Sequence, residues 1–266
     1  MARRLETTRT ALTWSDDGAT VTKRPTSDYH DTVLGSYRDA FRNEIRVNRM
    51  LAVEPPPVLT PRVVAFSTRD RSLTVGAVEG DPLGPKFALA LRAGEVDDLV
   101  KLIEALKSYR PRRRWFRRFD IDRRLRLHVD EGIITPSDAQ AVADLAARHP
   151  LRYRFAHGDV TARNVIRDST GRLVRIDWEW AGLYPTGYEI AFLWLSLIDV
   201  AGGREVVEKA IRPRDHVAFL ISAVLIQLLH LHLWLGLPRR EFLPNHEHTL
   251  HALLRTVHSK SSTLAS

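Results

Sequence analysis

The sequence predicts an α+β fold: strands and one helix in the N-terminal part, and mainly helices in the larger C-terminal part. Two observations carry this prediction. The first 78 residues alternate as strand, strand, helix, strand and strand, whereas the pattern after residue 85 is mainly helical. Between them, the sequence EGDP at 79–82 interrupts both patterns. We therefore predict two parts, residues 1–80 and residues 81–266.

The composition fits this size of fold and excludes several kinds of chemistry. The chain has 266 residues, 44% of them hydrophobic, which is enough for a sizeable core in one large domain or two lobes. It contains no cysteine, so disulfides, thiolate metal sites and thiol nucleophiles are excluded. No apolar run follows the basic N-terminus, so we expect no secretory signal, and a reducing cytoplasm fits. The net charge of +8 favours anionic partners, such as nucleotides, phosphorylated substrates or nucleic acid.

Four strands are predicted in the N-terminal lobe. Residues 11–14 and 19–23 form a hairpin around an Asp-Asp-Gly turn. Residues 62–66 and 72–78 form two more strands around a polar turn. Lys23 ends the second strand of the first hairpin. It is either an ordinary exposed lysine or a compact cation held by a specific partner.

A helix is predicted over residues 36–52, before a run of three prolines. One stripe at helical spacing carries the residues expected to face the core, which are Phe41, Ile45, Asn48 and Leu51. Glu44 shares that stripe, and a carboxylate that faces a core needs a cationic partner. We predict that this partner is Lys23. The alternative is that Glu44 lies exposed at the edge of the stripe and bonds to Arg38 or Asn48.

Residues 155–180, FAHGDVTARNVIRDSTGRLVRIDWEW, hold the densest cluster of candidate functional groups. Strand-forming residues flank an Asp-Ser-Thr-Gly turn at 168–171, which predicts a hairpin. Folding the chain back at this turn places Asn164 opposite the segment that ends at Asp177, with cross-strand Cβ atoms about 5 Å apart. An amide oxygen and a carboxylate at that separation suit Mg²⁺. Asp159 is a further acidic group at the same edge.

An Asp, four residues, an Asn, a hairpin and a second Asp form the catalytic core of protein-kinase-like phosphotransferases. The His-Gly-Asp sequence at 157–159 and the Ile-Asp-Trp-Glu sequence at 176–179 resemble the aminoglycoside phosphotransferase and choline kinase branch, which phosphorylates small molecules. The resemblance implies a bilobal protein-kinase-like fold. Residues 1–80 would be the nucleotide-binding lobe and residues 81–266 the catalytic and substrate-binding lobe. It also implies ATP or GTP and Mg²⁺ as cofactors.

The resemblance gives each catalytic candidate a role. Asp159 would accept a hydrogen bond from the substrate hydroxyl and take its proton late. Asn164 and Asp177 would hold Mg²⁺, and Lys23, fixed by Glu44, would hold the α- and β-phosphates.

Three further assignments follow from the same resemblance. Arg163 would neutralise charge on the transferring group, or it is an ordinary surface arginine. The backbone of Ala77, Val78, Glu79 and Gly80 would meet the adenine edge. His157 is expected to be structural, bonded to backbone near Asp177, because the family's base is the aspartate two residues on.

The chain departs from protein kinases in one respect. No glycine precedes Gly18, so the glycine-rich phosphate loop is absent, and there is no Walker A motif. The hydroxyls and backbone of residues 5–10 are the expected substitute.

The stretch from Arg110 to Arg126 holds nine arginines. It is either a solvated face over Trp115, Phe116 and Phe119 or a surface for an anionic substrate or RNA. The second reading gives an alternative function, an inactive kinase-like module that binds nucleic acid. For an active enzyme, these arginines favour a neutral or anionic hydroxyl acceptor, such as an antibiotic, a sugar or a metabolite.

The C-terminal third is predicted to be helical. Residues 217–237 contain no charged side chain and are long enough to span a membrane. Gln227, His230 and His232 would be costly in lipid, so we expect a buried core helix and no membrane partner. His246, His248 and His251 lack HExxH spacing and a fourth ligand, so we expect no zinc there.

Overall fold

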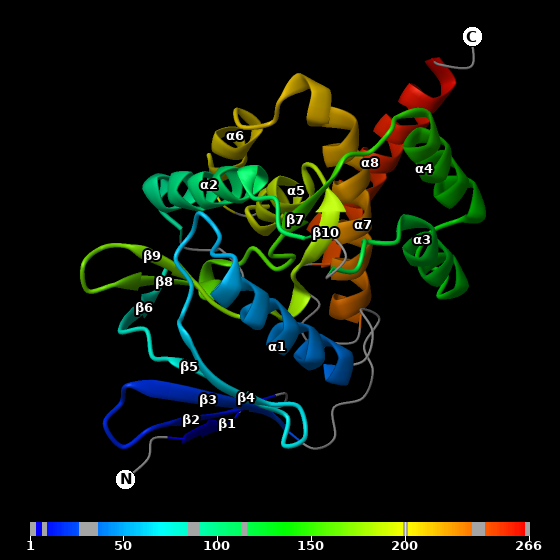
Figure 1. Cartoon of the computed structure of the whole chain (residues 1–266). Helices are drawn as coiled ribbons and strands as arrows, with labels where there is room; N and C mark the ends of the chain where they lie inside the picture. The colour runs from blue at the N-terminus through cyan, green and yellow to red at the C-terminus, as the bar shows by residue number, and fades with distance from the viewer. Residues whose placement is uncertain are drawn as a thin grey trace.

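The computed structural model describes residues 4–6, 10–26, 37–84, 91–112, 116–198, 200, 202–235 and 243–263. It confirms the predicted two-lobed α+β architecture. Figure 1 shows an antiparallel sheet with helix α1 over one face, and a larger group of helices on the other side of α1. Where the chain divides into two parts stays a prediction.

The N-terminal sheet has five antiparallel strands in the order β1-β2-β3-β5-β4. They are β1 (Arg4–Glu6), β2 (Thr10–Trp14), β3 (Thr20–Pro25), β4 (Val63–Ser67) and β5 (Ser72–Gly76). Strand β1 was not predicted, and it occupies part of the stretch expected to cover the phosphates. Thr7, Thr8 and Arg9 of that stretch lie outside the described residues. Lys23 lies on β3, opposite Leu12 on one side and Leu73 on the other.

Helix α1 (Tyr37–Val53) lies within one residue of its predicted bounds. All the predicted stripe residues are buried, and so is Glu44, at 3% exposure. Phe41 and Ile45 pack against Leu73 of the sheet, whereas Val47 and Leu51 pack in a second cluster with residues of the C-terminal lobe. Helix α1 therefore joins the two lobes.

A short strand, β6 (Gly80–Pro82), forms the connection between the lobes. It pairs with β8 (Val165–Asp168), which pairs with β9 (Leu173–Arg175) in the predicted hairpin. Gly80 has a φ of +144°, and a Cβ there would lie 2.1 Å from the Arg167 carbonyl oxygen. Only glycine fits this close approach of two backbones. The segment expected to act as a hinge is therefore bonded directly to the hairpin that ends at Asp177.

The C-terminal lobe is built mainly of helices and also contains a two-stranded sheet of β7 and β10. Its elements are α2 (Ala93–Ser108), α3 (Ile121–Asp130), α4 (Pro136–Arg148), β7 (Tyr153–Ala156), η2 (Ala162–Asn164), η3 (Trp178–Trp180), β10 (Gly182–Pro185), α5 (Tyr188–Ser196), α6 (Gly203–Glu208), η4 (Pro213–Asp215), α7 (His216–Leu235) and α8 (Leu243–Thr263). Helix α4 begins at the predicted cap, where the Thr135 hydroxyl accepts from the Asp138 N–H at 3.1 Å.

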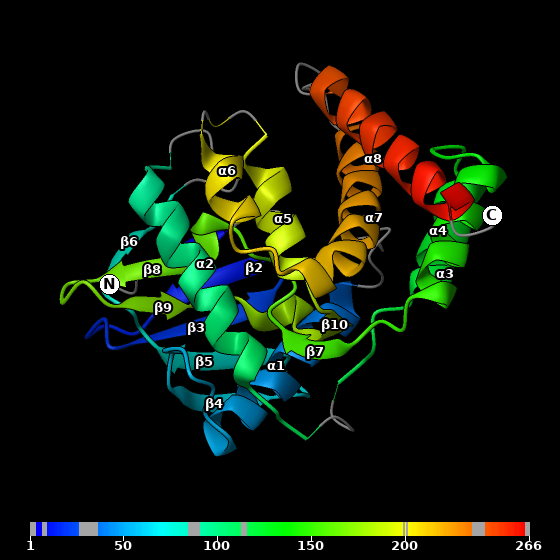
Figure 2. The same ribbon diagram turned by 90° about the horizontal axis from the view of Figure 1, so that it is seen from above.

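Helix α7 is the uncharged segment singled out in the sequence. A window over Pro213–His232 is long and apolar enough to cross a membrane, yet 78% of it is buried inside the protein. The helix packs between α5 and α8, as Figure 2 shows from above. Gln227 is buried and donates to the His246 backbone carbonyl at 2.7 Å. This is the packing of a core helix.

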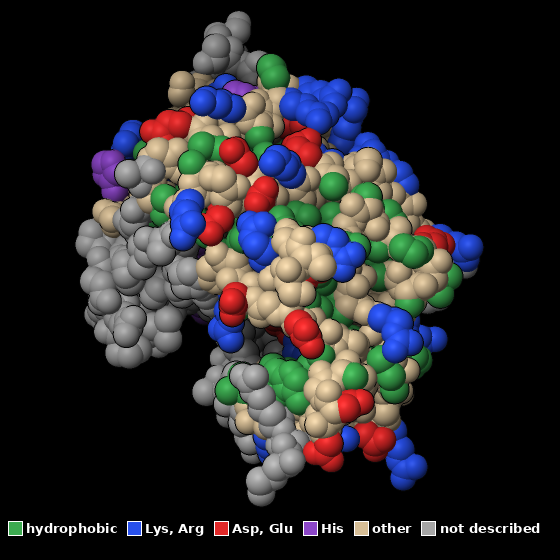
Figure 3. All heavy atoms as spheres, turned by 90° about the vertical axis from the view of Figure 1, so that its left-hand side faces the viewer, with side chains coloured by type: hydrophobic (Ala, Val, Ile, Leu, Met, Phe, Trp, Pro, Cys, Tyr) green, Lys and Arg blue, Asp and Glu red, His purple; other side chains and the backbone are tan. Residues whose placement is uncertain are grey.

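The arginine-rich stretch contacts acids and aromatic rings. Arg112 pairs with Glu54 at 2.9 Å, and the Arg118 guanidinium lies 3.8 Å from the centre of the Tyr153 ring. Phe116 is buried and Phe119 packs against the core, as predicted for a solvated face, while Trp115 lies outside the described residues. Figure 3 shows basic and acidic side chains interspersed on another face of the molecule. Arg167 pairs with Asp98 at 3.0 Å. Neither region favours the nucleic-acid alternative.

Candidate active site

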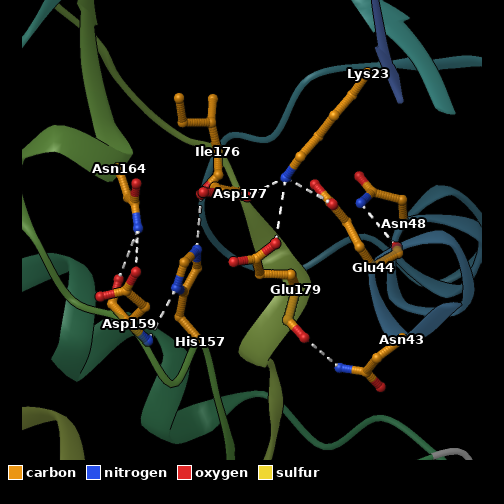
Figure 4. Close-up of polar contacts among 10 residues, drawn as sticks. All are labelled: Lys23, Asn43, Glu44, Asn48, His157, Asp159, Asn164, Ile176, Asp177 and Glu179. Carbon is orange, nitrogen blue, oxygen red and sulfur yellow. Dashed lines mark hydrogen bonds and ion pairs between the residues drawn. The ribbon is translucent and has the colours of Figure 1, made fainter. Parts of the chain in front are cut away.

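The candidate site lies where the lobes meet. Figure 4 shows side chains from β3, helix α1 and both flanks of the β8–β9 hairpin directed toward one another. Two clusters are visible. Lys23 lies among three carboxylates, and Asp159 lies with Asn164 and His157.

Lys23 is held by three acidic side chains. Its Nζ lies 2.8 Å from Glu44 Oε2, 2.5 Å from Asp177 Oδ1 and 3.5 Å from Glu179 Oε2. The predicted pairing of Lys23 with Glu44 is therefore confirmed. Asn48 instead donates to the backbone carbonyl of Glu44, at 2.9 Å.

The charges of this cluster do not balance. One ammonium faces three carboxylates, which leaves a formal excess of two negative charges when all three are ionised. Burial raises the pKa of Glu44 to about 8, and burial also raises the pKa of Glu179 against the attraction of Lys23. Loss of solvent also opposes ionisation of Asp177, but the charge and hydrogen bond of Lys23 outweigh it and lower this pKa. A divalent cation bound among these oxygens would favour the ionised form of all three carboxyls, so the set suits such an ion.

The hairpin brings the predicted metal ligands to one edge. The Ile176 N–H donates to the Asn164 carbonyl at 3.0 Å, so Asp177 follows directly after the residue paired with Asn164. Asp177 has a φ of +64°, a left-handed conformation that aspartate tolerates better than most residues. The side chain of Asn164 turns toward Asp159: its Nδ2 donates to Asp159 Oδ2 at 2.9 Å and to the Asp159 carbonyl at 3.2 Å. Its Oδ1 is the atom that would bind a metal.

His157 is structural, as predicted. Its ring is buried, and Nε2 lies 2.8 Å from the Ile176 carbonyl, which can only accept, so Nε2 carries the proton. Burial, with the charge of Arg175, lowers the pKa of His157 to about 3. The neutral ring therefore ties the segment before Asp159 to the segment before Asp177.

This buried histidine predicts a pH dependence of stability. The folded protein keeps His157 neutral down to about pH 3, whereas the unfolded chain protonates it below about pH 6.5, so stability falls as the pH drops through that window. Replacing His157 with glutamine should remove about 2 kcal/mol of the loss between pH 6.5 and pH 4.5. Urea unfolding at both pH values measures it. His216→Gln, at an exposed histidine, is the control, and parallel profiles for wild type and His157→Gln would contradict this assignment.

Three residues that build the site, Glu179, Asn43 and Glu189, were not predicted from the sequence. Glu179 was quoted only as part of a motif, yet it completes the acidic cluster. Asn43 of α1 donates to the carbonyls of Glu179 and Ala181, both at 2.9 Å. Glu189 accepts from the His157 N–H at 3.0 Å and from the Arg175 guanidinium at 3.2 Å, forming a buried ion pair beneath the site. Residue spacing gave no signal for these contacts, since their partners come from distant segments.

The remaining predicted residues have defined places, and their roles stay predictions. Arg163 is exposed on the turn η2, close enough that its charge contributes to the lowered pKa of Asp177. Ala77, Val78 and Glu79 link β5 to β6, where Gly80 begins. The Ala77 N–H donates to the Ala19 carbonyl at 2.9 Å, so this donor is already engaged within the N-terminal lobe.

Comparison with known proteins identifies the family. The model of the phosphotransferase enzyme family matches residues 7–214. The chain belongs to the phosphotransferase enzyme family. This confirms the resemblance drawn from the motifs, and the acidic cluster of this phosphotransferase lies within the matched region. No curated protein matches the chain in sequence.

Solved structures share the fold of this phosphotransferase at low identity. A choline/ethanolamine kinase family protein from Mesorhizobium loti has a TM-score of 0.67 at 17% identity, over 99% of this chain and 87% of its own. Choline kinase LicA from Streptococcus pneumoniae has a TM-score of 0.68 at 14% identity, covering 96% and 93%. The GDP and kanamycin complex of APH(2")-IIIa has a TM-score of 0.61 at 15% identity, covering 98% and 93%.

Proposed function

We propose that this phosphotransferase moves the γ-phosphate of ATP or GTP to a hydroxyl group of a small molecule, with Mg²⁺ as its cofactor. The observation that carries the proposal is the placing of Lys23, Glu44 and Asp177 in one cluster beside the Asp159–Asn164 pair. The solved relatives support the nucleotide, since they include LicA with AMP, an ADP-bound aminoglycoside phosphotransferase and the GDP complex named above.

The donor set fits Mg²⁺. Carboxylate oxygens of Glu44, Asp177 and Glu179 lie within 4.8 Å of one another, and the amide oxygen of Asn164 is at the same edge. Oxygen ligands are those that Mg²⁺ prefers, and it usually binds one or two carboxylates together with substrate phosphates. When bound by Asp177 and Asn164, the ion would supply neutralisation of phosphate charge.

The residues of the chain would then act by positioning and proton transfer. Asp159, oriented by Asn164, accepts a hydrogen bond from the acceptor hydroxyl. As the new oxygen–phosphorus bond forms, the bond from the γ-phosphorus to the bridging oxygen breaks and the nucleoside diphosphate leaves. The hydroxyl proton passes to Asp159. Lys23, oriented by Glu44, holds the α- and β-phosphates, and Arg163 neutralises charge on the transferred group.

We propose a neutral or anionic acceptor. Besides the arginines already noted, Arg124 and Asp159 both act on the pKa of one buried phenol, Tyr184. The Arg124 guanidinium lies 5.6 Å from the centre of the Phe119 ring, which packs against Tyr184 with ring centres 5.2 Å apart. Burial raises the pKa of Tyr184, while the charges of Arg124 and Asp159 act on it in opposite directions, so both lie near this phenol. Candidate acceptors are hydroxylated antibiotics, sugars and metabolites, and we propose a cytoplasmic setting for the reaction.

The test is a transfer assay with three acceptor groups. Purified protein, Mg²⁺ and either ATP or GTP are incubated with cationic aminoglycosides and choline, with neutral hydroxylated antibiotics and sugars, or with anionic metabolites. Phosphorylation is detected by the mass of the acceptor. We expect product in the second or third group. Product only with the cationic group would overturn the proposed acceptor class. A protein that binds neither ATP nor GTP in the presence of Mg²⁺ would overturn the proposed function.

A further inference from the structure

A second cluster of ligand-type side chains lies between helices α3 and α7, outside the candidate active site. His128 is on the last turn of α3, Glu131 follows that helix, and His232 is on α7. One ligand atom from each lies within 4.8 Å of the others. The two helices lie side by side in both ribbon views (Figures 1 and 2). Three residues from two helices therefore converge on one point.

His128 gives an independent reason to consider a ligand. Its side chain has no exposed surface, and neither ring nitrogen has a hydrogen-bond partner. A buried polar atom without a partner typically costs about 1–3 kcal/mol, so such groups call for an explanation. The ring lies beside His232, with centres 6.3 Å apart. Both ring nitrogens are thus available, and a neutral imidazole can offer a lone pair to a metal.

We propose that His128, Glu131 and His232 bind one Zn²⁺ ion that joins α3 to α7. Two imidazoles with one carboxylate form a donor set typical of zinc, and imidazole ligands disfavour Mg²⁺ and Ca²⁺. Glu131 and His232 are partly exposed, at 32% and 28% of their side chains, so water can supply the fourth ligand.

The geometry requires only a small adjustment. Two atoms bound to one tetrahedral zinc ion at about 2.1 Å lie about 3.4 Å apart, so the widest pair of the cluster, at most 4.8 Å apart, must close by up to about 1.4 Å. At present His232 Nδ1 and Glu131 Oε2 contact each other directly, and the ion would enter between them. The site is at the C-terminal end of α3, where the helix dipole favours a cation. Arg124, whose charge also acts on His128, lies one helical turn before it. Its guanidinium is directed over the Phe119 ring.

The rival explanation is a direct His232–Glu131 ion pair with His128 as a plain buried histidine. Zinc binding distinguishes these two explanations. The protein is first stripped of metal with a chelator, and its zinc affinity is then measured by competition with a chromophoric chelator. Excess Mg²⁺ is present to occupy the active-site carboxylates. We expect one Zn²⁺ per chain and a raised Tm, and Co²⁺ should give the visible absorption of a four-coordinate site. Variants His232→Gln and Glu131→Gln should each weaken binding by about tenfold or more.

The matched control is His258→Gln. His258 Nε2 contacts Asp138 Oδ1 at 2.8 Å, also a histidine–carboxylate contact between two helices, and neither residue belongs to the cluster. It should leave zinc affinity unchanged. The His128→Gln variant should lose zinc binding if it folds. If it does not fold, the His232→Gln and Glu131→Gln variants, at partly exposed positions, test the site. Equal zinc affinity in wild type, His232→Gln and Glu131→Gln would overturn the site, as would wild-type protein that retains no zinc.

Discussion

Replacing Asp159 with alanine should lower turnover on the order of 10³-fold or more while nucleotide binding survives. The expected loss is large because Asp159 is the residue assigned to the acceptor proton. Nucleotide binding should survive because Lys23, which we propose holds the phosphates, is itself held by Glu44, Asp177 and Glu179. Single-turnover transfer and nucleotide titration measure the two effects separately.

The control for this variant is Arg163→Ala. It removes an exposed side chain four residues away, on the same loop, and should cost less than the loss of Asp159 because a point charge is screened by solvent. Turnover that persists in Asp159→Ala would remove this residue from its assigned role. Loss of nucleotide binding in the same variant would show that Asp159 organises the phosphate site instead.

Replacing Lys23 with methionine should reduce both turnover and stability. The side chain is only 14% exposed and faces three carboxylates, and removing one member of such a buried pair typically costs about 3–5 kcal/mol. Because the pKa of Glu44 is about 8, the loss of stability should grow as the pH rises through 8, where wild-type Glu44 is ionised and paired with Lys23. Urea unfolding measures stability, and the transfer assay measures turnover.

A double variant separates structure from catalysis. Lys23→Met combined with Glu44→Gln removes one cation and one anion together, so it should recover part of the lost stability without recovering turnover. A double variant that is as unstable as Lys23→Met would mean that Glu44 is not the main partner of Lys23. A double variant that regains turnover would mean that Lys23 acts only as a structural cation.

Local sequence patterns predicted much of the site. The β8–β9 hairpin, the buried stripe of α1 and the pairing of Lys23 with Glu44 follow from periodicity, turn residues and the need of a buried carboxylate for a cation. Family resemblance then supplied the roles. The hairpin and the helical stripe depend on residues that are close in sequence. The Lys23–Glu44 pair is more distant, but it matches the strand-lysine and helix-glutamate pair known from protein kinases.

Contacts without a motif could not be predicted. Asn43 bonds to the backbone of Glu179, which lies 136 positions later in the chain. His128 and Glu131 are three positions apart, but a helix places many such pairs on one face, and His232 comes from a helix noted only for its lack of charge. The added strand β1 has three residues, too few to show an alternating pattern. Tertiary packing decides these features, and residue spacing carries no trace of them.

The attachment of α1 to the second lobe bears on how such an enzyme would be controlled. Protein kinases are switched off by swinging the helix that carries the glutamate partner of the lysine. Here Asn43 bonds that helix to the backbone after Asp177, and Val47 and Leu51 pack with Trp178. An outward swing would break these bonds and expose an apolar interface. We therefore expect an always-assembled catalyst whose output follows the supply of nucleotide and acceptor.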